Sequence, residues 1–437
     1  MAVAAARSAH SPQFRLRRFL NWFPLGLTYA AMYMARYNLP LANNPLREAY
    51  HWDKAQFGTI ASTATLVYGF AALLNGPLAD RLGGRKAMLI GSCGAFAFNV
   101  VFGLGAYLGL LAPGQWILWF LTAAWTLNMY FQSFSALALI KVNSAWFHVS
   151  ERGVFSAIFG SMIQSGRFLV FLLLATPFVA HLPWQWLFFI PAAIVAVMTL
   201  ATFLMVQDSP ARAGLGEFDP EDATSGDTEK VTLGYVARRV FTNPVAVTIA
   251  VAEFCTGLVR WGFDLWFPSY MVEVQHLKLD NPVFQRNALA VVAAGVAGAF
   301  IAGYASDKLF GHRRPPVAFI GYALQVVSLA IVWRAPGPGW VLVAFIVNSL
   351  AISMVHSMLS GTASMDFGGK RAAATAAGLF DGMQHIGGSL VGFGMGSLLQ
   401  RYGWGIWGPS MIGFSGIGAI LMLTLWNARP RRSGAAH

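Results

Sequence analysis

Long apolar runs dominate this chain of 437 residues. Each run is long enough to cross a bilayer as a helix, which takes about 20 residues. Only 11% of the residues are charged and 56% are hydrophobic, a composition that could not cover the surface of a soluble protein of this size. We therefore predict an integral membrane protein made entirely of helices. The twelve runs lie at residues 22–45, 57–79, 87–111, 116–141, 153–179, 184–206, 244–272, 287–306, 316–334, 340–365, 372–399 and 404–427.

One long polar segment, residues 207–243, divides the runs into two sets of six. Its acidic residues, with glycine and proline throughout, are typical of a flexible linker. The sequence thus predicts a six-helix half at residues 1–206, a linker at 207–243 and a second six-helix half at 244–437.

The formal net charge of +12 could suggest a nucleic-acid ligand, but the positions of the 30 Lys and Arg residues indicate membrane topology instead. Most of them fall in loops on one side of the predicted helices. Because cytoplasmic loops carry an excess of Lys and Arg, we predict that this side is cytoplasmic and holds both termini and the linker. No nucleic-acid partner is expected.

The first apolar run carries an arginine, Arg36, near its middle. A guanidinium at bilayer depth costs about 2.5–3.5 kcal/mol on insertion scales, so it normally faces a protein interior or an aqueous path. Tyr29, Tyr33 and Asn43 lie at helical spacing from Arg36 and are predicted to share its face. This face would line a polar cavity; the alternative is an architectural arginine that caps a neighbouring helix end.

The seventh apolar run carries a second arginine, Arg260. Glu253 and Asp264 lie at helical spacing from it, so both acids are expected to share its face and temper its charge. Two helices that each present an arginine inward predict an anionic ligand between them. A guanidinium donates two parallel hydrogen bonds to a phosphate or carboxylate, which a lysine cannot do.

A short loop motif occurs once in each half. GPLADRLGGRK follows the second run and GYASDKLFGHRR follows the eighth, and the two aspartates are separated by nearly the same distance along the chain as Arg36 and Arg260. The halves are therefore predicted to be repeats. A charged loop that pairs differently in two conformations can act as a latch between helices. The residues predicted to form this latch are Gly76, Asp80, Arg81, Arg85 and Asp307.

GPLADRLGGRK resembles the signature loop between the second and third helices of the major facilitator superfamily. The resemblance implies the major facilitator fold, with twelve transmembrane helices in two six-helix halves, and transport by alternating access. Three further stretches, YMARYNLPLA, LVRWGFDLWFPSYMVEV and MDFGGKRAAATAAGLFDGMQHIGGS, resemble the organophosphate/inorganic phosphate antiporters, most closely their glycerol-3-phosphate branch.

This narrower resemblance implies roles for single residues. Arg36 and Arg260 match the arginines that bind the substrate phosphate in that family, and Gln132 matches a pore-lining glutamine of the fourth helix. Tyr33 and Tyr29 match the tyrosines one and two turns before the first arginine. The implied function is exchange of an organophosphate for inorganic phosphate across a bacterial inner membrane, by a carrier that works as a monomer without a cofactor. Its expected partners are a small phosphate-bearing anion and the lipid bilayer.

Two site residues of the glycerol-3-phosphate branch are missing here. Ala72 stands in place of a lysine on the second helix, and Met162 and Ile163 stand where the fifth helix of that branch has a histidine. The organic part of the substrate is therefore expected to differ from glycerol.

New polar residues occur instead on the fifth and eleventh runs. Arg167 either pairs with Asp381 as a structural bridge or contacts the substrate, because a buried charge must be compensated either way. Asp381 and His385 are four residues apart and share a helix face. His385 is a candidate proton carrier or a neutral hydrogen-bond donor to the substrate, and the second role is favoured.

No enzymatic motif competes with transport. The sequence contains no Walker loop, no metal-ligand cluster and no paired catalytic carboxylates in a loop, so neither an enzyme nor a metal site is predicted. Two alternatives to phosphate exchange stay open. One is a proton-coupled carrier of an organic anion, with Asp381, Glu253 or His385 carrying the proton, and the other is a membrane sensor of sugar phosphates that signals to a kinase.

Overall fold

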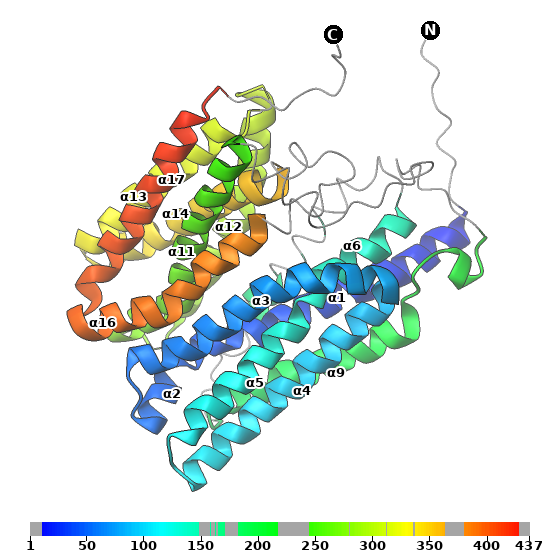
Figure 1. Ribbon diagram of the computed structural model, residues 1–437, viewed down its shortest axis with the longest axis horizontal. Coiled ribbons are helices and arrows are strands. Elements are labelled where there is room, and N and C mark those ends of the chain that lie inside the picture. Colours follow the sequence, from blue (N-terminus) through cyan, green and yellow to red (C-terminus); the bar gives the residue numbers. More distant parts are fainter. Residues whose placement is uncertain are drawn as a thin grey trace.

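The computed structural model of the chain describes residues 11–147, 158, 162, 165–170, 182–216, 244–278, 280–311, 313–334, 337–362 and 380–427. All regular elements in these ranges are helices, and they form two bundles that meet along one side, the first blue to green and the second green to red in Figure 1. The predicted all-helical fold is confirmed.

The first bundle is built around α4, which packs against α5 and α9, while α1 packs against α9 and α3 against α5. Its helices are α1 (Pro12–Leu41), α2 (Asn43–Tyr50), α3 (Lys54–Leu82), α4 (Gly84–Leu111), α5 (Trp116–Gln132), α6 (Phe134–Trp146) and α9 (Trp186–Met205).

The second bundle has α14 packed against α12 and α13, and α17 packed against α11 and α13. Its elements are α11 (Pro244–Glu273), α12 (Pro282–Lys308), α13 (Pro315–Arg334), α14 (Pro338–His356), the π-helix η2 (Ser357–Thr362), a helical segment at 380–390, the π-helix η3 (Val391–Met395), α16 (Gly396–Tyr402), η4 (Trp404–Ile406) and α17 (Trp407–Thr424).

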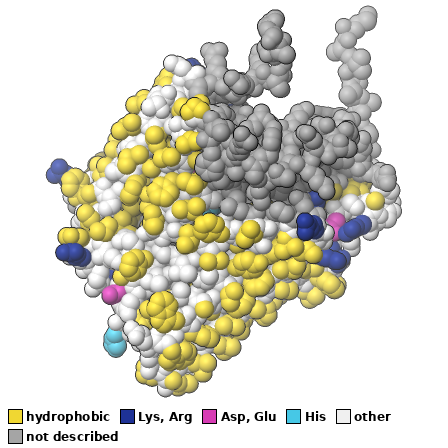
Figure 2. Space-filling view, viewed as in Figure 1, with side chains coloured by type: hydrophobic (Ala, Val, Ile, Leu, Met, Phe, Trp, Pro, Cys, Tyr) yellow, Lys and Arg dark blue, Asp and Glu magenta, His cyan; other side chains and the backbone are white. Residues whose placement is uncertain are grey.

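The outer surface of both bundles suits a lipid environment. Seven of the described helices are long and apolar enough to cross a membrane, namely α4, α9, α11, α12, α13, α14 and α17. Large hydrophobic side chains such as Phe203 and Ile420 are exposed on them, and Figure 2 shows hydrophobic atoms spread over the visible face. The protein is an integral membrane protein. The count of twelve spans stays a prediction, since parts of the apolar runs at 153–179 and 372–399 lie outside the described residues.

The turn between α1 and α2 changes one expectation about the site. α1 ends at Leu41, and Ala42 separates it from α2, which begins at Asn43. The helical spacing that relates Asn43 to Arg36 therefore does not continue across this turn. The Asn43 side chain is buried, and neither of its polar atoms has a hydrogen-bond partner in the described part of the chain.

The first copy of the loop motif forms a tight turn between α3 and α4. Gly83 in this turn has a φ of +87°, which glycine adopts without the strain that a Cβ would cause. The N–H of Arg85 donates to Oδ1 of Asp208 at 2.8 Å, so the start of the polar segment packs against the first bundle. The short helix η1 (Ala211–Ala213) follows, and residues 217–243 of the predicted linker lie outside the described residues.

The two bundles meet along α1 and α11 and where η3 and α16 pack against α3. At one point the backbones approach so closely that only glycine fits: a Cβ on Gly58 would lie 2.0 Å from the carbonyl oxygen of Gly392. Beside it, the N–H of Phe393 donates to Oγ of Ser62 at 2.7 Å. We call the part of the molecule that contains α2, α16 and the last residues of α11 the α2–α16 end. In Figure 1, the start of α1 and the end of α17 lie far from the α2–α16 end.

Candidate functional site

Arg36 is buried in the first bundle, where it is 6% exposed, and it makes no ion pair with any described residue. Its Nε donates to Oε1 of Gln132 on α5 at 2.9 Å. The guanidinium lies over the rings of Tyr33 and Tyr68, 4.8 and 4.7 Å from their centroids. Its Nη2 makes no hydrogen bond in the described part of the protein. These contacts hold the cation in place without neutralising it.

A polar network fixes the orientation of Gln132. Its Nε2 donates to the carbonyl oxygen of Ala35 at 3.1 Å and to Oδ1 of Asn128 at 3.0 Å, which leaves Oε1 free to face Arg36. Asn99 in turn donates to Oδ1 of Asn128 at 3.1 Å. The match of Gln132 to the family glutamine is thus accompanied by a direct contact with Arg36.

The predicted tyrosines belong to a longer aromatic row on α1. Tyr29 meets Tyr33 edge to face at 5.3 Å, and Tyr33 stacks on Tyr37 at 5.7 Å between ring centroids. Tyr37 then stacks on Trp261 of α11 at 6.5 Å. The row therefore connects the surroundings of Arg36 with the second bundle. Sequence reasoning missed Tyr37, although its spacing of four from Tyr33 was a readable signal.

Arg260 on α11 is held mainly by neutral side chains. Its Nη1 donates to Oε1 of Gln384 at 3.0 Å and lies 3.1 Å from Nε2 of His356. Its Nε is 4.0 Å from Oδ2 of Asp264, so the predicted sharing of a face is confirmed, but the two groups lie at the outer limit of an ion pair. His356 was missed, although a histidine inside an apolar run is itself a signal of function.

Glu253 reaches Arg260 only through another side chain. It is fully buried, and its Oε2 accepts a hydrogen bond of 3.0 Å from Nε2 of Gln384. The same Nε2 lies 2.7 Å from Nδ1 of His356. The spacing argument correctly placed Glu253 on the inner face of α11, while the intervening Gln384 could not be deduced from it.

Arg167 pairs with Asp264 and not with Asp381, so the predicted structural bridge is wrong in its partner. Nη2 of Arg167 contacts Oδ1 of Asp264, and the guanidinium lies 5.0 Å from the ring centroid of Tyr37. The hydroxyl of Tyr37 donates to Oδ2 of Asp264 at 3.2 Å. Helical spacing within one run cannot reveal which helices of different bundles face each other, and Asp264 on α11 is the carboxylate that faces Arg167.

Asp381 and His385 lie on one face of the helical segment 380–390, as their spacing predicts. Nδ1 of His385 is 3.6 Å from Oδ2 of Asp381 and 2.8 Å from the carbonyl oxygen of the same residue. The His385 ring stacks on Tyr68 of α3 at 4.5 Å, which brings the pair to the contact between the bundles. The Asp381 side chain is 37% exposed.

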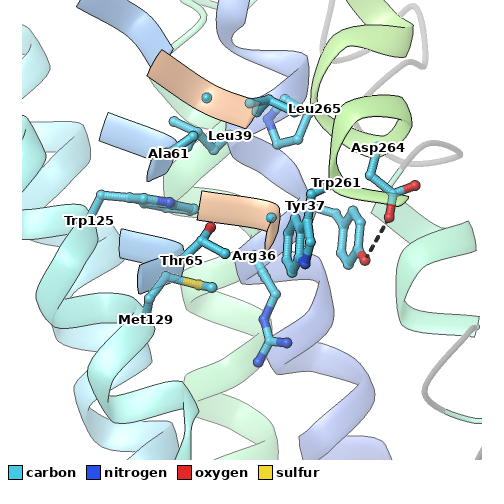
Figure 3. A pocket seen from close by; sticks show the side chains of 13 residues that line it. Arg36, Tyr37, Leu39, Ala61, Thr65, Trp125, Met129, Trp261, Asp264 and Leu265 are labelled. Atoms are coloured by element: carbon cyan, nitrogen blue, oxygen red, sulfur yellow. Dashed lines mark hydrogen bonds between the residues drawn. The ribbon is translucent and has the colours of Figure 1, made fainter. Parts of the chain in front are cut away.

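A small cavity lies beside these groups, lined by Arg36, Tyr37 and Asp264 among others. Figure 3 shows Trp261 alongside Tyr37, the Tyr37 hydroxyl pointing to Asp264, and the guanidinium of Arg36 extending away from Ala61. The cavity holds about 30 Å³, which is room for about two water molecules and too little for a phosphate ester. An organic anion could enter this cavity only if the helices that line it moved apart.

The predicted latch residues are placed only in part. Gly76, Asp80 and Arg81 lie in the last turns of α3, and Asp307 lies near the end of α12. The side chains of Asp80 and Asp307 fall outside what the structure describes. Arg81 is exposed, and the guanidinium of Arg85 donates to the carbonyl oxygen of Phe203 on α9. In the described residues, no group of three His, Cys, Asp or Glu side chains is placed to hold a metal ion.

A sequence model of the Major Facilitator Superfamily matches residues 25–392, which is most of the chain. The chain belongs to this superfamily. The predicted major facilitator fold is therefore confirmed. A solved structure agrees in fold: the bacterial homologue of the human lysosomal transporter Spinster, in an inward-facing and unoccupied conformation, has a TM-score of 0.70 at 14% identity, covering 95% of this chain and 94% of that chain.

Curated relatives match this member of the superfamily over nearly its whole length. The glycerol-3-phosphate transporter of Bacillus subtilis (strain 168) is 26% identical, covering 96% of this chain and 94% of that protein. A probable hexose phosphate transport protein of Chlamydia pneumoniae is 24% identical, with 96% and 93% covered. The membrane sensor protein UhpC of Escherichia coli (strain K12) is 25% identical, with 93% and 91% covered. These relatives confirm the resemblance that the arginine-bearing stretches indicated.

Proposed function

We propose that this protein exchanges an organophosphate for inorganic phosphate by alternating access, with the phosphate group bound between Arg36 and Arg260. The names of two relatives, a glycerol-3-phosphate transporter and a hexose phosphate transport protein, support a substrate of this class. In this proposal the protein is a membrane transporter and not an enzyme.

One observation carries the proposal: a buried arginine, Arg36, and a half-buried one, Arg260, come from different bundles, and neither donates a hydrogen bond to a carboxylate within the described residues. Arg36 also keeps a buried Nη2 without a partner there. Cations inside a membrane protein are costly when their charge is not fully compensated, so an anion that binds both arginines stabilises the pair. A phosphate group, with its charge and its several acceptor oxygens, suits two guanidinium groups.

The same arrangement supports exchange as the mode of transport. An anion that binds both arginines draws the two bundles together, because each arginine belongs to a different bundle. Without an anion this attraction between the bundles is absent. The protein would therefore reorient readily with either phosphate species bound and poorly with neither, which couples entry of one to exit of the other.

The finer features of the carrier belong to the same proposal. We place both termini in the cytoplasm because most Lys and Arg residues fall in loops on that side. Twelve spans, in halves at 1–206 and 244–437, follow from the apolar runs and agree with the two bundles seen in Figure 1. Each bundle contributes one arginine from within the same chain, which supports a functional monomer.

The test is a counterflow measurement with the purified protein in proteoliposomes loaded with labelled inorganic phosphate. Glycerol-3-phosphate, glucose-6-phosphate and unphosphorylated glycerol are offered outside. The proposal predicts that at least one phosphorylated compound accelerates release of the label and that glycerol does not. Release that no phosphorylated compound accelerates, in protein shown to be folded, overturns it. Release driven by a pH gradient alone would favour the proton-coupled carrier instead.

A membrane sensor is the second candidate, because one relative of similar identity is a membrane sensor protein. A sensor needs to bind its ligand and change conformation, but it need not transport at a useful rate. Binding of glucose-6-phosphate measured by calorimetry, together with no release of labelled phosphate in the counterflow assay, would favour this reading over exchange.

A further inference from the structure

Three carboxylates lie in the region of the two arginines, and they differ in how their charge is compensated. The Asp264 side chain is 3% exposed and contacts Arg167. Glu253 is fully buried and accepts a hydrogen bond from Gln384. Asp381, in contrast, is 37% exposed and has no Lys or Arg within ion-pair distance among the described residues. It is therefore the accessible carboxylate of the three.

His385 does not take the place of a cationic partner for Asp381. Its Nδ1 lies 2.8 Å from the backbone carbonyl oxygen of Asp381 and 3.6 Å from the carboxylate, which is beyond hydrogen-bond distance. The ring stacks on Tyr68 at 4.5 Å between centroids. Among the described residues, no side chain donates a hydrogen bond to the Asp381 carboxylate.

The position of Asp381 relates it to the phosphate site. The segment 380–390 packs tightly on α11, since a Cβ on Gly257 would lie 1.9 Å from the carbonyl oxygen of Gln384. In the same segment, Gln384 accepts a hydrogen bond from Arg260, and His385 stacks on Tyr68, whose ring lies 4.7 Å from the guanidinium of Arg36. The carboxylate thus lies in the same region as both arginines without pairing with either of them.

An uncompensated carboxylate in this position discriminates between substrates. It repels an acidic group on the organic part of a phosphate ester, because like charges destabilise each other, and it offers a neutral organic part no charge-assisted contact. An ammonium group on the organic part reverses the sign of this interaction and supplies three hydrogen-bond donors to Asp381.

We propose that Asp381 binds a cationic group of the substrate, and that the preferred substrates are zwitterions with a phosphate or phosphonate at one end and an ammonium group at the other. The proposal deepens the proposed function and rests on it for the site of the phosphate.

The test compares two probes of nearly equal size, 2-aminoethylphosphonate and 2-hydroxyethylphosphonate, which differ in an ammonium group versus a hydroxyl group. Calorimetry on the purified full-length protein measures the dissociation constant of each. The ammonium compound is expected to bind about tenfold more tightly, the gain of one charge-assisted contact. This comparison needs no variant. Equal affinities, or tighter binding of the hydroxyl compound, overturn the proposal.

Asp381→Asn then assigns the preference to this side chain. The ratio of the two dissociation constants should fall to about one, while Asp280→Asn, a matched change at an exposed carboxylate outside the site, keeps the ratio of the parent. A preference that survives in Asp381→Asn overturns the role of Asp381. Asp381→Ser provides a second variant if the first does not fold.

Phosphate self-exchange in proteoliposomes separates this proposal from the one on which it rests. Exchange without a preference for the ammonium compound overturns the zwitterion proposal alone. A preference in binding without any exchange overturns the exchange function and keeps the assignment of Asp381.

Discussion

Arg47 donates a hydrogen bond of 2.7 Å from its Nη1 to Oε1 of Glu273, which joins α2 of the first bundle to the last residue of α11 in the second. Two further groups meet the same carboxylate: Nζ of Lys54 lies 2.8 Å from Oε2, and Nε1 of Trp404 donates to Oε2 at 2.9 Å. We call these four residues the Glu273 clamp. It holds the bundles together at the α2–α16 end.

Removing the charge of the clamp should let the α2–α16 end open more often. Glu273→Gln keeps the shape of the side chain but loses both ion pairs, each of which is partly exposed and worth up to about 1 kcal/mol. A total of about 1–2 kcal/mol corresponds to about a five- to thirty-fold larger open population. Maleimide labelling of the cysteine in Ala61→Cys, in a protein that lacks Cys93 and Cys255, measures this open population. Ala61 is buried, so the cysteine reacts only when the bundles separate.

Glu48→Gln is the matched control for this experiment, since Glu48 is an exposed carboxylate on the same short helix as Arg47. Its labelling rate should equal that of the parent. If Glu273→Gln labels no faster than Glu48→Gln, the clamp does not hold this end closed.

Backbone contact at the same end gives an independent prediction. A Cβ on Gly58 would lie 2.0 Å from the carbonyl oxygen of Gly392, so Gly58→Ala must push α3 away from η3. Such overpacking costs the closed arrangement about 1–3 kcal/mol. Labelling of Ala61→Cys should accelerate, while Gly413→Ala, where a Cβ meets nothing within 4 Å, should have no effect. Slower labelling in Gly58→Ala would show that this contact is not part of the closed end.

The contact between Arg167 and Asp264 predicts a specific pattern of stability. Arg167→Gln leaves the Asp264 carboxylate, 3% exposed, with only the more distant Arg260 at 4.0 Å, and breaking a buried pair from one side costs up to about 3–5 kcal/mol. Adding Asp264→Asn removes the unpaired charge, so the double variant should unfold at a higher temperature than Arg167→Gln alone. Thermal unfolding in detergent checks this. Losses that simply add in the double variant would contradict a direct pair.

Residues that lie on one helix could be related to each other from the sequence. Arg36 with Tyr33, Arg260 with Asp264, and Asp381 with His385 are all neighbours at helical spacing, and the structure has each pair in contact or within 4.0 Å. The pattern of apolar runs likewise sufficed for the fold class, because a span can be recognised from its own residues.

Contacts between the bundles could not be predicted in this way. Arg167 and Asp264 are far apart in the sequence, and so are Arg47 and Glu273, and no periodicity relates them. Gln384 illustrates the same limit, since a single polar residue in a glycine-rich run gave no sign that it joins Glu253 to Arg260. Such pairings depend on how whole helices pack, which is a property of the tertiary structure.

The central claim is that Arg36 and Arg260 together bind phosphate, and the most direct measurement is phosphate self-exchange in proteoliposomes with Arg36→Lys and Arg260→Lys. A lysine keeps the charge but loses the forked pair of donors, so each variant should slow exchange by about ten- to a hundred-fold, the value of one or more hydrogen bonds to a charged group. Arg401→Lys, an exposed arginine on α16, is the control and should exchange at the parental rate. Exchange by both site variants at the rate of this control would contradict the claim.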